Sequence, residues 1–299
     1  MRNAFAQALY DAAVADERIC VLAADISPAG PLVEFQRRFP RRFLNVGVAE
    51  QAMIGVAAGM AIRGLRPFVY TIATFALYRP FEFVRDDLAY QSLPVTVVGM
   101  GSGLNYSTLG STHHSQEDVA VACAIPGLQV IAPCDPQTTE RAVEYCATQQ
   151  AGPVYLRIGK AGEPDLPCVS GPWSVDAVRY HRWGRDTCII GYGPIVALGL
   201  QVAEEHHCSV ASCHSLKPLP VRCLKHILAN YARVVVIEEH SPIGGLGTKI
   251  KELACDTGYR GVVRCVSLAD EFIHFHGDRD ELLARHGLTK DRVVAFLHN

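Results

Sequence analysis

The sequence lacks the patterns that mark several specialised classes of protein. No apolar stretch is long enough to cross a membrane, and the 28 lysines and arginines do not outnumber the 30 aspartates and glutamates. There is no P-loop. Gly99, Gly101 and Gly103 do not make a dinucleotide fingerprint, because no helix is expected directly after them. These absences argue against a membrane-spanning protein, a nucleic-acid-binding protein and a Rossmann-type nucleotide-binding protein.

Cysteine and histidine are frequent but not arranged as metal or disulfide motifs. The 11 cysteines include no C-x-x-C pair, and several lie inside apolar runs such as residues 187–190. This pattern predicts reduced, buried thiols in a cytoplasmic protein, and polar residues interrupt the N-terminal stretch where a signal peptide would be apolar. Four of the 12 histidines form the adjacent pairs 113–114 and 206–207, and neighbours on a helix do not share a face. We therefore expect no metal site built by this chain.

Strands and helices are expected to alternate along the first half of the chain. Residues 19–24 form a continuous apolar run, as in a parallel strand that is covered on both faces. The pattern predicts a doubly wound α/β domain with a parallel sheet. Its expected strands are 19–24, 43–46, 67–70, 95–99, 128–132 and 154–158, and its expected helices are 2–16, 50–63, 75–91 and 136–149.

A smaller α/β unit is expected to follow. The 299 residues, 49% of them hydrophobic, suffice for two domains of about 150 residues each. Residues 159–173 are rich in glycine and proline and have little periodicity. We assign residues 1–165 to the first domain, 166–182 to a linker and 183–299 to the second. The second should contain strands 187–190, 209–213, 233–238 and 262–266 and helices 195–205, 221–231 and 247–256.

Glu50 stands out because it opens a helix that is apolar on nearly every side and directly follows a short strand. Such a helix should be buried. One interpretation is an acidic residue favoured at a helix N-terminus by the helix dipole. The other is a carboxyl group whose pKa is raised by apolar surroundings, so that it shares a proton with a bound ligand. Position alone favours the first.

The motif around Glu50 resembles the pyrimidine-binding domain of transketolase-like, thiamine-diphosphate enzymes. The matching pattern is G-V-A-E-Q followed by A-x-x-G-x-A-x-G-M-A-x-x-G-x-x-P-F, and the likeness continues through residues 71–80, 93–95, 112–114, 125–128 and 133–136. Residues 238–247 resemble the E-E-H…G-G-L-G turn of the transketolase C-terminal domain, and 217–220 resemble its K-P-L-D segment. The resemblance covers essentially the whole chain.

The resemblance implies a set of functional residues. Glu50 would hydrogen-bond N1′ of the cofactor's aminopyrimidine, so that the ring itself removes the C2 proton. The implied cofactor-binding residues are Asp25, Ser27, Val48, Glu50, Ile72, Phe75 and Tyr78. The implied catalytic residues are Glu50 and His113, and the implied substrate-binding residues are Arg2, His113 and Arg157, whose guanidinium groups suit a phosphate.

The sequence also departs from the family pattern. Ile72 replaces an aromatic residue of the T-F-x-x-F-x-x-Y motif, and Gly101 and Leu109 replace a histidine and an aspartate that bind sugar hydroxyls in the family. The G-D-G motif that holds the diphosphate through Mg²⁺ is absent, since residues 277–279 read G-D-R in a turn near the C-terminus. The resemblance thus implies half a site for thiamine diphosphate, with Mg²⁺ and the diphosphate bound mainly by a separate N-terminal subunit, in an α₂β₂ heterotetramer.

The predicted function is the C-terminal subunit of a split transketolase-like enzyme, which transfers a two-carbon ketol unit from a ketose-type donor to an aldehyde. Two other enzymes remain open: a deoxyxylulose-phosphate-synthase-like enzyme that first decarboxylates a 2-oxo acid, and the β subunit of a 2-oxo-acid dehydrogenase, whose H-S-Q is matched at residues 114–116. A homologue without cofactor, with a regulatory or structural role, is the non-enzymatic alternative. Retention of Glu50 and Phe75 argues against it.

Overall fold

The computed structural model describes residues 1–26, 28 and 30–298, and the chain divides into two compact units. The first unit contains Met1–Ser102, Ala122–Ile131 and Asp135–Pro164. The second contains Gly103–Val121, Ala132–Cys134 and the chain from Asp165 onward. The glycine-rich loop after residue 102, which the sequence analysis includes in residues 1–165, is therefore grouped with the second unit. The predicted boundaries at 165 and 183 stay a prediction.

Six strands of the first unit form a parallel sheet in the order β5-β6-β4-β3-β1-β2. β1 and β6 are buried along their whole length; the continuous apolar sequence of β1 predicts this, whereas β6 also buries the side chain of Arg157. The short β2 lies at the sheet edge and is more exposed. The strands are β1 (Ile19–Ala23), β2 (Phe43–Asn45), β3 (Arg66–Ile72), β4 (Thr96–Met100), β5 (Gln129–Ile131) and β6 (Val154–Ile158).

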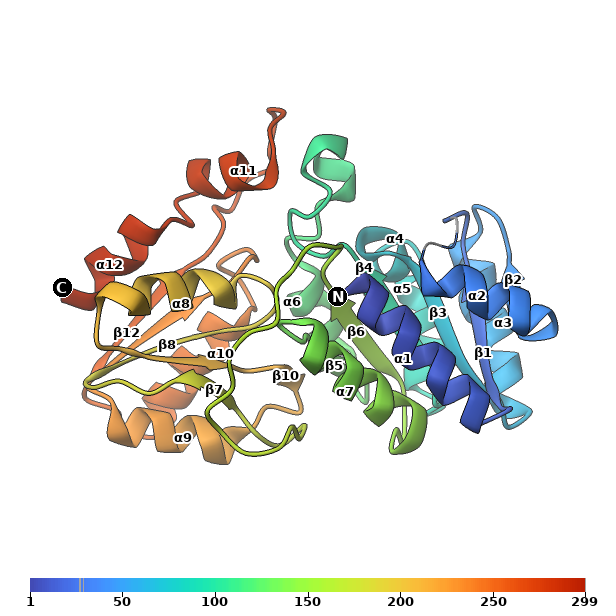
Figure 1. Cartoon of the computed structure of the whole chain (residues 1–299), viewed down its shortest axis with the longest axis horizontal. Helices are drawn as coiled ribbons and strands as arrows, with labels where there is room; N and C mark the ends of the chain where they lie inside the picture. The colour runs from blue at the N-terminus through green and yellow to red at the C-terminus, as the bar shows by residue number, and fades with distance from the viewer. Residues whose placement is uncertain (27, 29, 299) are drawn as a thin grey trace. The chain divides into compact units, whose positions relative to one another are not determined.

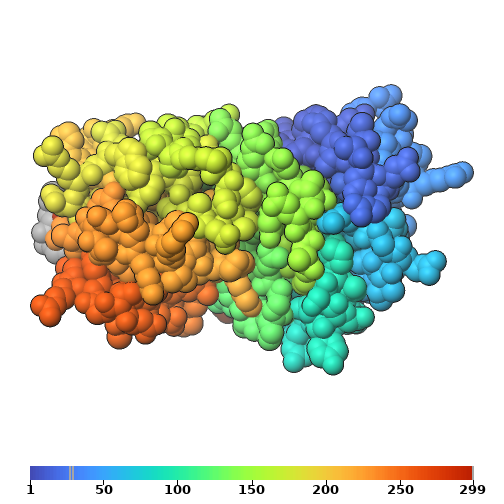
Figure 2. Space-filling view, turned by 90° about the horizontal axis from the view of Figure 1, so that it is seen from below, coloured from blue at the N-terminus to red at the C-terminus, as the bar shows by residue number. Residues whose placement is uncertain are grey.

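Helices cover both faces of this sheet. α1 (Arg2–Ala15) packs beside α7 (Pro136–Thr148) and α2 (Pro31–Arg38), and Figures 1 and 2 show α1, in dark blue, at the surface. α3 (Glu50–Ile62) packs against β3 on the other side. Asp135 and Thr138 form a capping box at the start of α7, which fixes where this helix begins.

Two expectations for the first unit are wrong. The helix predicted over 75–91 is broken into α4 (Ala73–Leu77), α5 (Phe81–Phe83) and a π-helical turn η2 (Val84–Ala89), because Pro80 cannot continue a helix. The predicted 50–63 helix exists, but it is not buried all round. Val56 is 40% and Ile62 63% exposed on its outer face, since no other part of the described chain covers them.

The remaining short elements were not predicted from the sequence. They are η1 (Pro40–Arg42) and α6 (Asp118–Ala124), together with two 3₁₀ turns in the glycine-rich loop, η3 (Ser107–Leu109) and η4 (Ser111–His113). α2 was also missed. None of the helices in the described part of the chain is both long and apolar enough to cross a membrane.

The second unit is built on a five-stranded sheet in the order β12-β11-β8-β9-β7. Strands β12, β11, β8 and β9 are parallel, whereas the edge strand β7 pairs antiparallel with β9 through an irregularity between Tyr180 and Arg182. Its strands are β7 (Arg179–Arg182), β8 (Thr187–Gly191), β9 (Ser209–Ser212), β11 (Arg233–Ile237) and β12 (Val262–Val266), and a short strand β10 covers Ser215–Lys217. β7 lies inside the predicted linker and was not expected as a strand.

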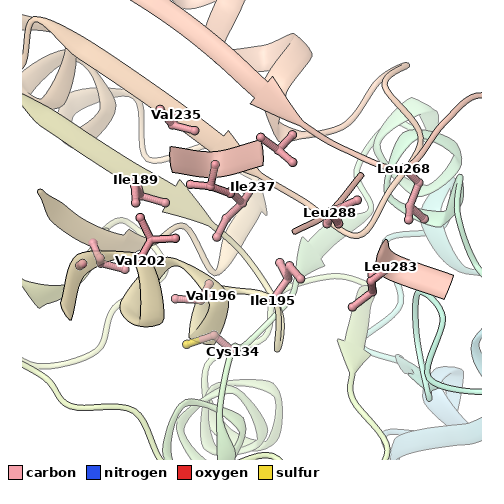
Figure 3. Packing of buried hydrophobic residues seen from close by; sticks show 14 of the residues in the cluster. Cys134, Ile189, Ile195, Val196, Val202, Val235, Ile237, Leu268, Leu283 and Leu288 are labelled. Carbon is pink, nitrogen blue, oxygen red and sulfur yellow. The ribbon is translucent and has the colours of Figure 1, made fainter. Parts of the chain in front are cut away.

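Helices of the second unit bury an aliphatic core on this sheet. Figure 3 shows Val196 and Val202 of α8 facing Ile189 of β8 and Ile237 of β11. Leu283 of α11 belongs to the same cluster. The helices are α8 (Val196–Glu205), α9 (Val221–Asn230), α10 (Leu246–Asp256), α11 (Arg279–Arg285) and α12 (Lys290–His298), of which the last two were not predicted.

Candidate cofactor and substrate site

The carboxyl ends of the parallel strands bring most of the predicted residues of the first unit to one edge of its sheet. Asp25 follows β1, Val48 follows β2, and Ile72 ends β3. Ligands of open parallel α/β sheets bind at this edge, because the loops that leave it diverge. Asp25, Val48 and Ile72 therefore share the edge at which sheets of this kind bind ligands. Ser27, also predicted to bind cofactor, lies outside the described residues.

Asn45 joins the loops that follow β1 and β2. Its side-chain oxygen accepts hydrogen bonds from the Asp25 amide at 3.3 Å and from the Gly47 amide at 2.9 Å. Gly47 has a φ of +72°, a conformation that favours glycine. The chain can therefore turn sharply from β2 into α3 and leave Val48 exposed at the sheet edge. This turn places Glu50 at the first position of α3.

Glu50 is buried and only half satisfied. Its residue is 2% exposed, and Oε1 accepts a hydrogen bond from Arg79 Nη1 at 2.8 Å. Within the described residues Oε2 is buried without any hydrogen-bond partner. The carboxyl group makes no side-chain cap of α3. An unpaired buried oxygen costs free energy, of the order of 1–3 kcal/mol, unless a ligand donates to it.

Arg79 is the functional candidate that the sequence analysis missed. Besides contacting Glu50, its guanidinium carbon lies 4.4 Å from the centre of the Phe75 ring, so the cation also packs on that aromatic face. Its side chain is 40% exposed. Arg79 follows Phe75 by four residues, a spacing that brings side chains together on a helix. That spacing was the available signal, but nothing in the sequence linked Arg79 to Glu50.

The other first-unit candidates lie on neighbouring elements. Phe75 belongs to α4 and Tyr78 directly follows this helix, and both residues are half-buried. Arg157 is buried within β6, where it pairs in register with Gly99 of β4. Arg2 opens α1, and its Nε is buried without a hydrogen-bond partner in the described structure. The structure therefore brings together Glu50, Arg79 and Phe75.

His113 belongs to the second unit, at the end of the turn η4. Its Nδ1 lies 2.9 Å from Thr112 Oγ1, and burial lowers the pKa of the imidazole from its usual value. Tyr106 lies on the same loop, with its ring centre 6.2 Å from that of His113. Leu109, at the predicted position of a lost hydroxyl-binding group, is 50% exposed. Burial in this loop thus favours the neutral form of the His113 imidazole.

The residues present fit an aminopyrimidine better than a metal ion. The unpaired Oε2 of Glu50 is a buried oxygen of the type that a ring nitrogen such as N1′ can pair with, and Phe75 supplies an aromatic surface on the adjacent helix. Among residues 1–26, 28 and 30–298, no group of three or more histidine, cysteine, aspartate or glutamate side chains is arranged to hold a metal ion.

Comparison with known proteins decides the family. The family described as "Transketolase, pyrimidine binding domain" matches residues 1–162, and "Transketolase, C-terminal domain" matches residues 176–293. The chain belongs to the transketolase family. An apulose-4-phosphate transketolase subunit of Phocaeicola vulgatus is 32% identical over 298 residues, which cover 98% of this chain and 94% of that relative. Transketolase-family enzymes are thiamine-diphosphate-dependent transferases, so the predicted class of enzyme is confirmed.

Two further matches refine this assignment. The 1-deoxy-D-xylulose-5-phosphate synthase of Azoarcus sp. is 34% identical over 98% of this chain, but the match covers only 47% of that enzyme. The chain thus spans about half the length of the synthases it matches. A solved structure described as a split-gene transketolase, inactive β4 tetramer, has a TM-score of 0.87 and 33% identity, covering 99% of this chain and 96% of that one. The predicted fold and the predicted C-terminal component of a split transketolase-like enzyme are confirmed.

Proposed function

We propose that this transketolase chain works with a separate N-terminal subunit to transfer a two-carbon ketol unit from a ketose-type donor to an aldehyde. The observation that carries the proposal is the buried, unpaired Oε2 of Glu50, at the position where the family's glutamate meets the aminopyrimidine. Bound thiamine diphosphate would supply the nucleophilic carbon that takes up and releases the two-carbon unit. The diphosphate and Mg²⁺ would be held mainly by the partner, since this sequence has no G-D-G motif.

The residues of this chain have distinct parts in the proposal. Glu50 holds a proton at N1′ through Oε2, while Arg79 fixes the carboxyl group through Oε1. Phe75 and Tyr78 line the aromatic ring of the cofactor. Asp25, Val48 and Ile72, at the carboxyl edge of the sheet, complete the cofactor contacts together with the predicted residue Ser27. Arg2 and Arg157 anchor an anionic end of the substrate, and His113 contacts its reacting portion.

The exposed outer face of α3 supports the proposal that a partner subunit binds this chain. Val56 and Ile62 are exposed there, and a Cβ added at Gly59 would meet nothing within 4 Å. An apolar, small-residue helix face of this kind allows another helix to approach closely. Because the same helix begins at Glu50, a subunit that covers α3 would also close the cofactor site. We propose an α₂β₂ heterotetramer in the cytoplasm.

The substrate is expected to differ from that of pentose-phosphate transketolases. Gly101 and Leu109 stand where two hydroxyl-binding groups occur in the family, whereas Arg157 keeps an anion anchor. A relative is called an apulose-4-phosphate transketolase subunit. We therefore propose a ketose phosphate such as apulose 4-phosphate as donor, and low activity with xylulose 5-phosphate plus ribose 5-phosphate.

The test uses this chain co-expressed with its candidate N-terminal subunit. Light scattering should report a heterotetramer, and calorimetry should show tight, Mg²⁺-dependent binding of thiamine diphosphate to the pair but weak binding to this chain alone. Tight Mg²⁺-dependent binding to the isolated chain would overturn the divided site. A panel of ketose phosphates and aldehydes then identifies the donor, and a catalytic efficiency of about 10⁴ M⁻¹s⁻¹ or more with xylulose 5-phosphate would refute the substrate proposal.

A deoxyxylulose-phosphate-synthase-like reaction is the second candidate, supported by the 34% identity to the Azoarcus synthase. It differs in an observable way, since it releases CO₂ from a 2-oxo acid. Including pyruvate with an aldose phosphate in the panel and measuring CO₂ release therefore separates the two reactions.

A further inference from the structure

The loop that carries His113 is closed at its base. The Gly103 amide donates to Ser115 Oγ at 2.7 Å, and the Ser115 amide donates to the Gly103 carbonyl at 3.0 Å. These bonds make residues 104–114 a closed loop in which His113 precedes the closing pair by two positions. Ser111 Oγ adds a hydrogen bond to the Ile273 carbonyl at 2.5 Å. A residue that fixes the closing pair Gly103 and Ser115, here called the base of the loop, therefore also helps to fix the position of His113.

Glu239 holds that base. The residue is 2% exposed, and its Oε1 accepts a hydrogen bond from the Leu104 amide at 2.6 Å. Gly103 has a φ of +64°, and a Cβ added to it would lie 2.7 Å from Glu239 Cδ. The loop thus approaches the carboxyl group so closely that only glycine fits at residue 103.

Arg279, at the start of α11, completes this arrangement. Its Nε and Nη2 donate to the two oxygens of Glu239 at 3.2 and 2.5 Å, as a guanidinium fork does with a carboxylate. His240 and Ser241, which follow Glu239 in the chain, add hydrogen bonds to residues just after the loop. His240 Nε2 accepts from the Ala120 amide at 3.3 Å, and the Ser241 amide donates to the Gln116 carbonyl at 2.7 Å.

Glu238 is equally buried but has a different role. Its oxygens accept from the Leu246 amide at 2.8 Å, the Gly247 amide at 3.0 Å and the Tyr192 hydroxyl at 3.2 Å. A Cβ at Gly245 would lie 2.2 Å from Glu238 Oε2, so that glycine leaves room for the carboxylate. Glu238 therefore satisfies the N-terminus of α10, whereas its neighbour Glu239 bonds to the base of the His113 loop.

We propose that Glu239, fixed by Arg279, is a positioning residue that sets the place of His113 for substrate binding. The proposal rests on the proposed function, because it takes His113 as a substrate contact. It also gives the E-E-H-S segment of the second unit two separate tasks, since Glu238 fixes α10 and Glu239 fixes the loop that carries His113.

The first test needs only the full chain and no substrate. Hydrogen exchange is measured on Glu239→Ala, Glu239→Gln and, as the matched control, Glu238→Gln. Glu239→Ala should increase exchange of the amides from 104 to 114 by at least about tenfold, with little change in β8. The exchange of these amides in Glu239→Gln should lie between that in Glu239→Ala and that in the unmodified chain, because the glutamine side-chain oxygen can still accept from the Leu104 amide. Glu238→Gln should loosen α10 instead.

If Glu239→Ala does not fold, Glu239→Gln and Arg279→Met are measured in its place. Each variant keeps an oxygen at residue 239 for the Leu104 amide but weakens or removes the ion pair between Glu239 and Arg279. The proposal would be overturned if hydrogen exchange of the amides from 104 to 114 were unchanged in a folded Glu239→Ala chain. It would also be overturned if this exchange were unchanged in both Glu239→Gln and Arg279→Met. Equal loosening of the loop by Glu238→Gln would overturn it too, because it would mean that the segment acts as one structural block.

The second test uses the assembled enzyme. A misplacement of about 1 Å can lower catalytic efficiency on the order of 10²-fold. Glu239→Ala should lose that much in kcat/KM, mainly through KM, whereas C2-proton exchange of bound thiamine diphosphate should stay unchanged. Partial recovery of KM by Glu239→Gln is expected. A loss confined to kcat, or a slowed C2-proton exchange, contradicts positioning of substrate. If the unmodified pair shows no activity, the proposed function fails, and the loop-exchange result still decides the role of Glu239.

Discussion

Replacing Glu50 by glutamine separates the chemical role of this residue from its structural role. Glutamine keeps the size of the side chain and one oxygen for Arg79 Nη1, but it cannot carry the proton that the proposed contact with N1′ requires. A positioned proton-transfer group contributes about 10²–10⁴-fold to a rate. Glu50→Gln should therefore lower turnover by at least about 10²-fold; the whole range corresponds to about 2.7–5.4 kcal/mol at about 1.36 kcal/mol per tenfold change.

The change in folding stability should be much smaller. Two unit charges about 4 Å apart attract each other by about 4 kcal/mol at an effective dielectric constant of about 20. Arg79 is 40% exposed, so water screens part of this attraction, and removing the charge of Glu50 also removes the cost of burying it. These effects nearly cancel, and we expect the free energy of unfolding to change by no more than about 1 kcal/mol.

The assay is C2-proton exchange of bound thiamine diphosphate, by deuterium labelling and quench, with urea unfolding measured in parallel. Glu238→Gln is the matched control, because it removes an equally buried carboxylate from the second unit. The control should lose stability but exchange the C2 proton at the normal rate. If Glu50→Gln exchanges that proton as fast as the unmodified enzyme, Glu50 does not act on the cofactor and the proposed mechanism fails.

Two other substitutions or reagents test the structure directly. Arg79→Met leaves the buried Glu50 carboxylate without its cation and should lower the free energy of unfolding by about 2 kcal/mol, whereas Arg79→Lys should lower it less. Urea unfolding measures both changes. Equal stability with methionine, lysine or arginine at residue 79 would contradict the ion pair. Burial raises the pKa of Cys20 to about 11 and that of Cys146 to about 12, so at pH 8 both should stay protonated and unlabelled by a thiol reagent, while the exposed Cys168 and Cys255 react. Mass spectrometry of the labelled peptides measures this, and rapid labelling of Cys146 in the folded chain would contradict its burial.

The sequence predicted the elements whose apolar pattern is strongest. Buried parallel strands such as β1, β6 and β8 are mostly apolar, so their positions could be found without a partner strand. β7 was missed because it is short and polar at both ends, and its antiparallel pairing with β9 depends on the rest of the sheet. The break after α4 was missed because the apolar periodicity over 75–91 continues across Pro80.

The candidate site was predictable only where a residue lies in a local motif. Glu50 follows a glycine turn and opens a helix, and both features are visible in the sequence. Its pairing with Arg79 is not, because the two residues are 29 positions apart and meet only when β2 and β3 flank β1 in one sheet. The hydrogen bond between Glu239 and Leu104 spans 135 positions, and no periodicity can reveal such a contact.

Cofactor binding and subunit association should be thermodynamically coupled through α3. This helix carries two features that the chain alone leaves unsatisfied: the unpaired Oε2 of Glu50 at its start and the exposed Val56 and Ile62 on its outer face. A partner that covers this face lowers the exposure of α3 and supplies the other half of the proposed site. Linkage then requires that thiamine diphosphate with Mg²⁺ tightens subunit association by the same factor by which the partner tightens cofactor binding.

Sedimentation of the two subunits, with and without cofactor, measures the first factor, and calorimetry with and without partner measures the second. Coupling free energies of this kind are typically about 1–3 kcal/mol, so both factors should lie between about 5- and 150-fold. Val56→Lys places a charge on the apolar face and should weaken association in both conditions, whereas the exposed Val14→Lys on α1 serves as a control. A cofactor that is bound jointly by two chains must favour the assembled state when it binds. An association constant that is the same with and without thiamine diphosphate and Mg²⁺ would therefore contradict a site divided between the two chains.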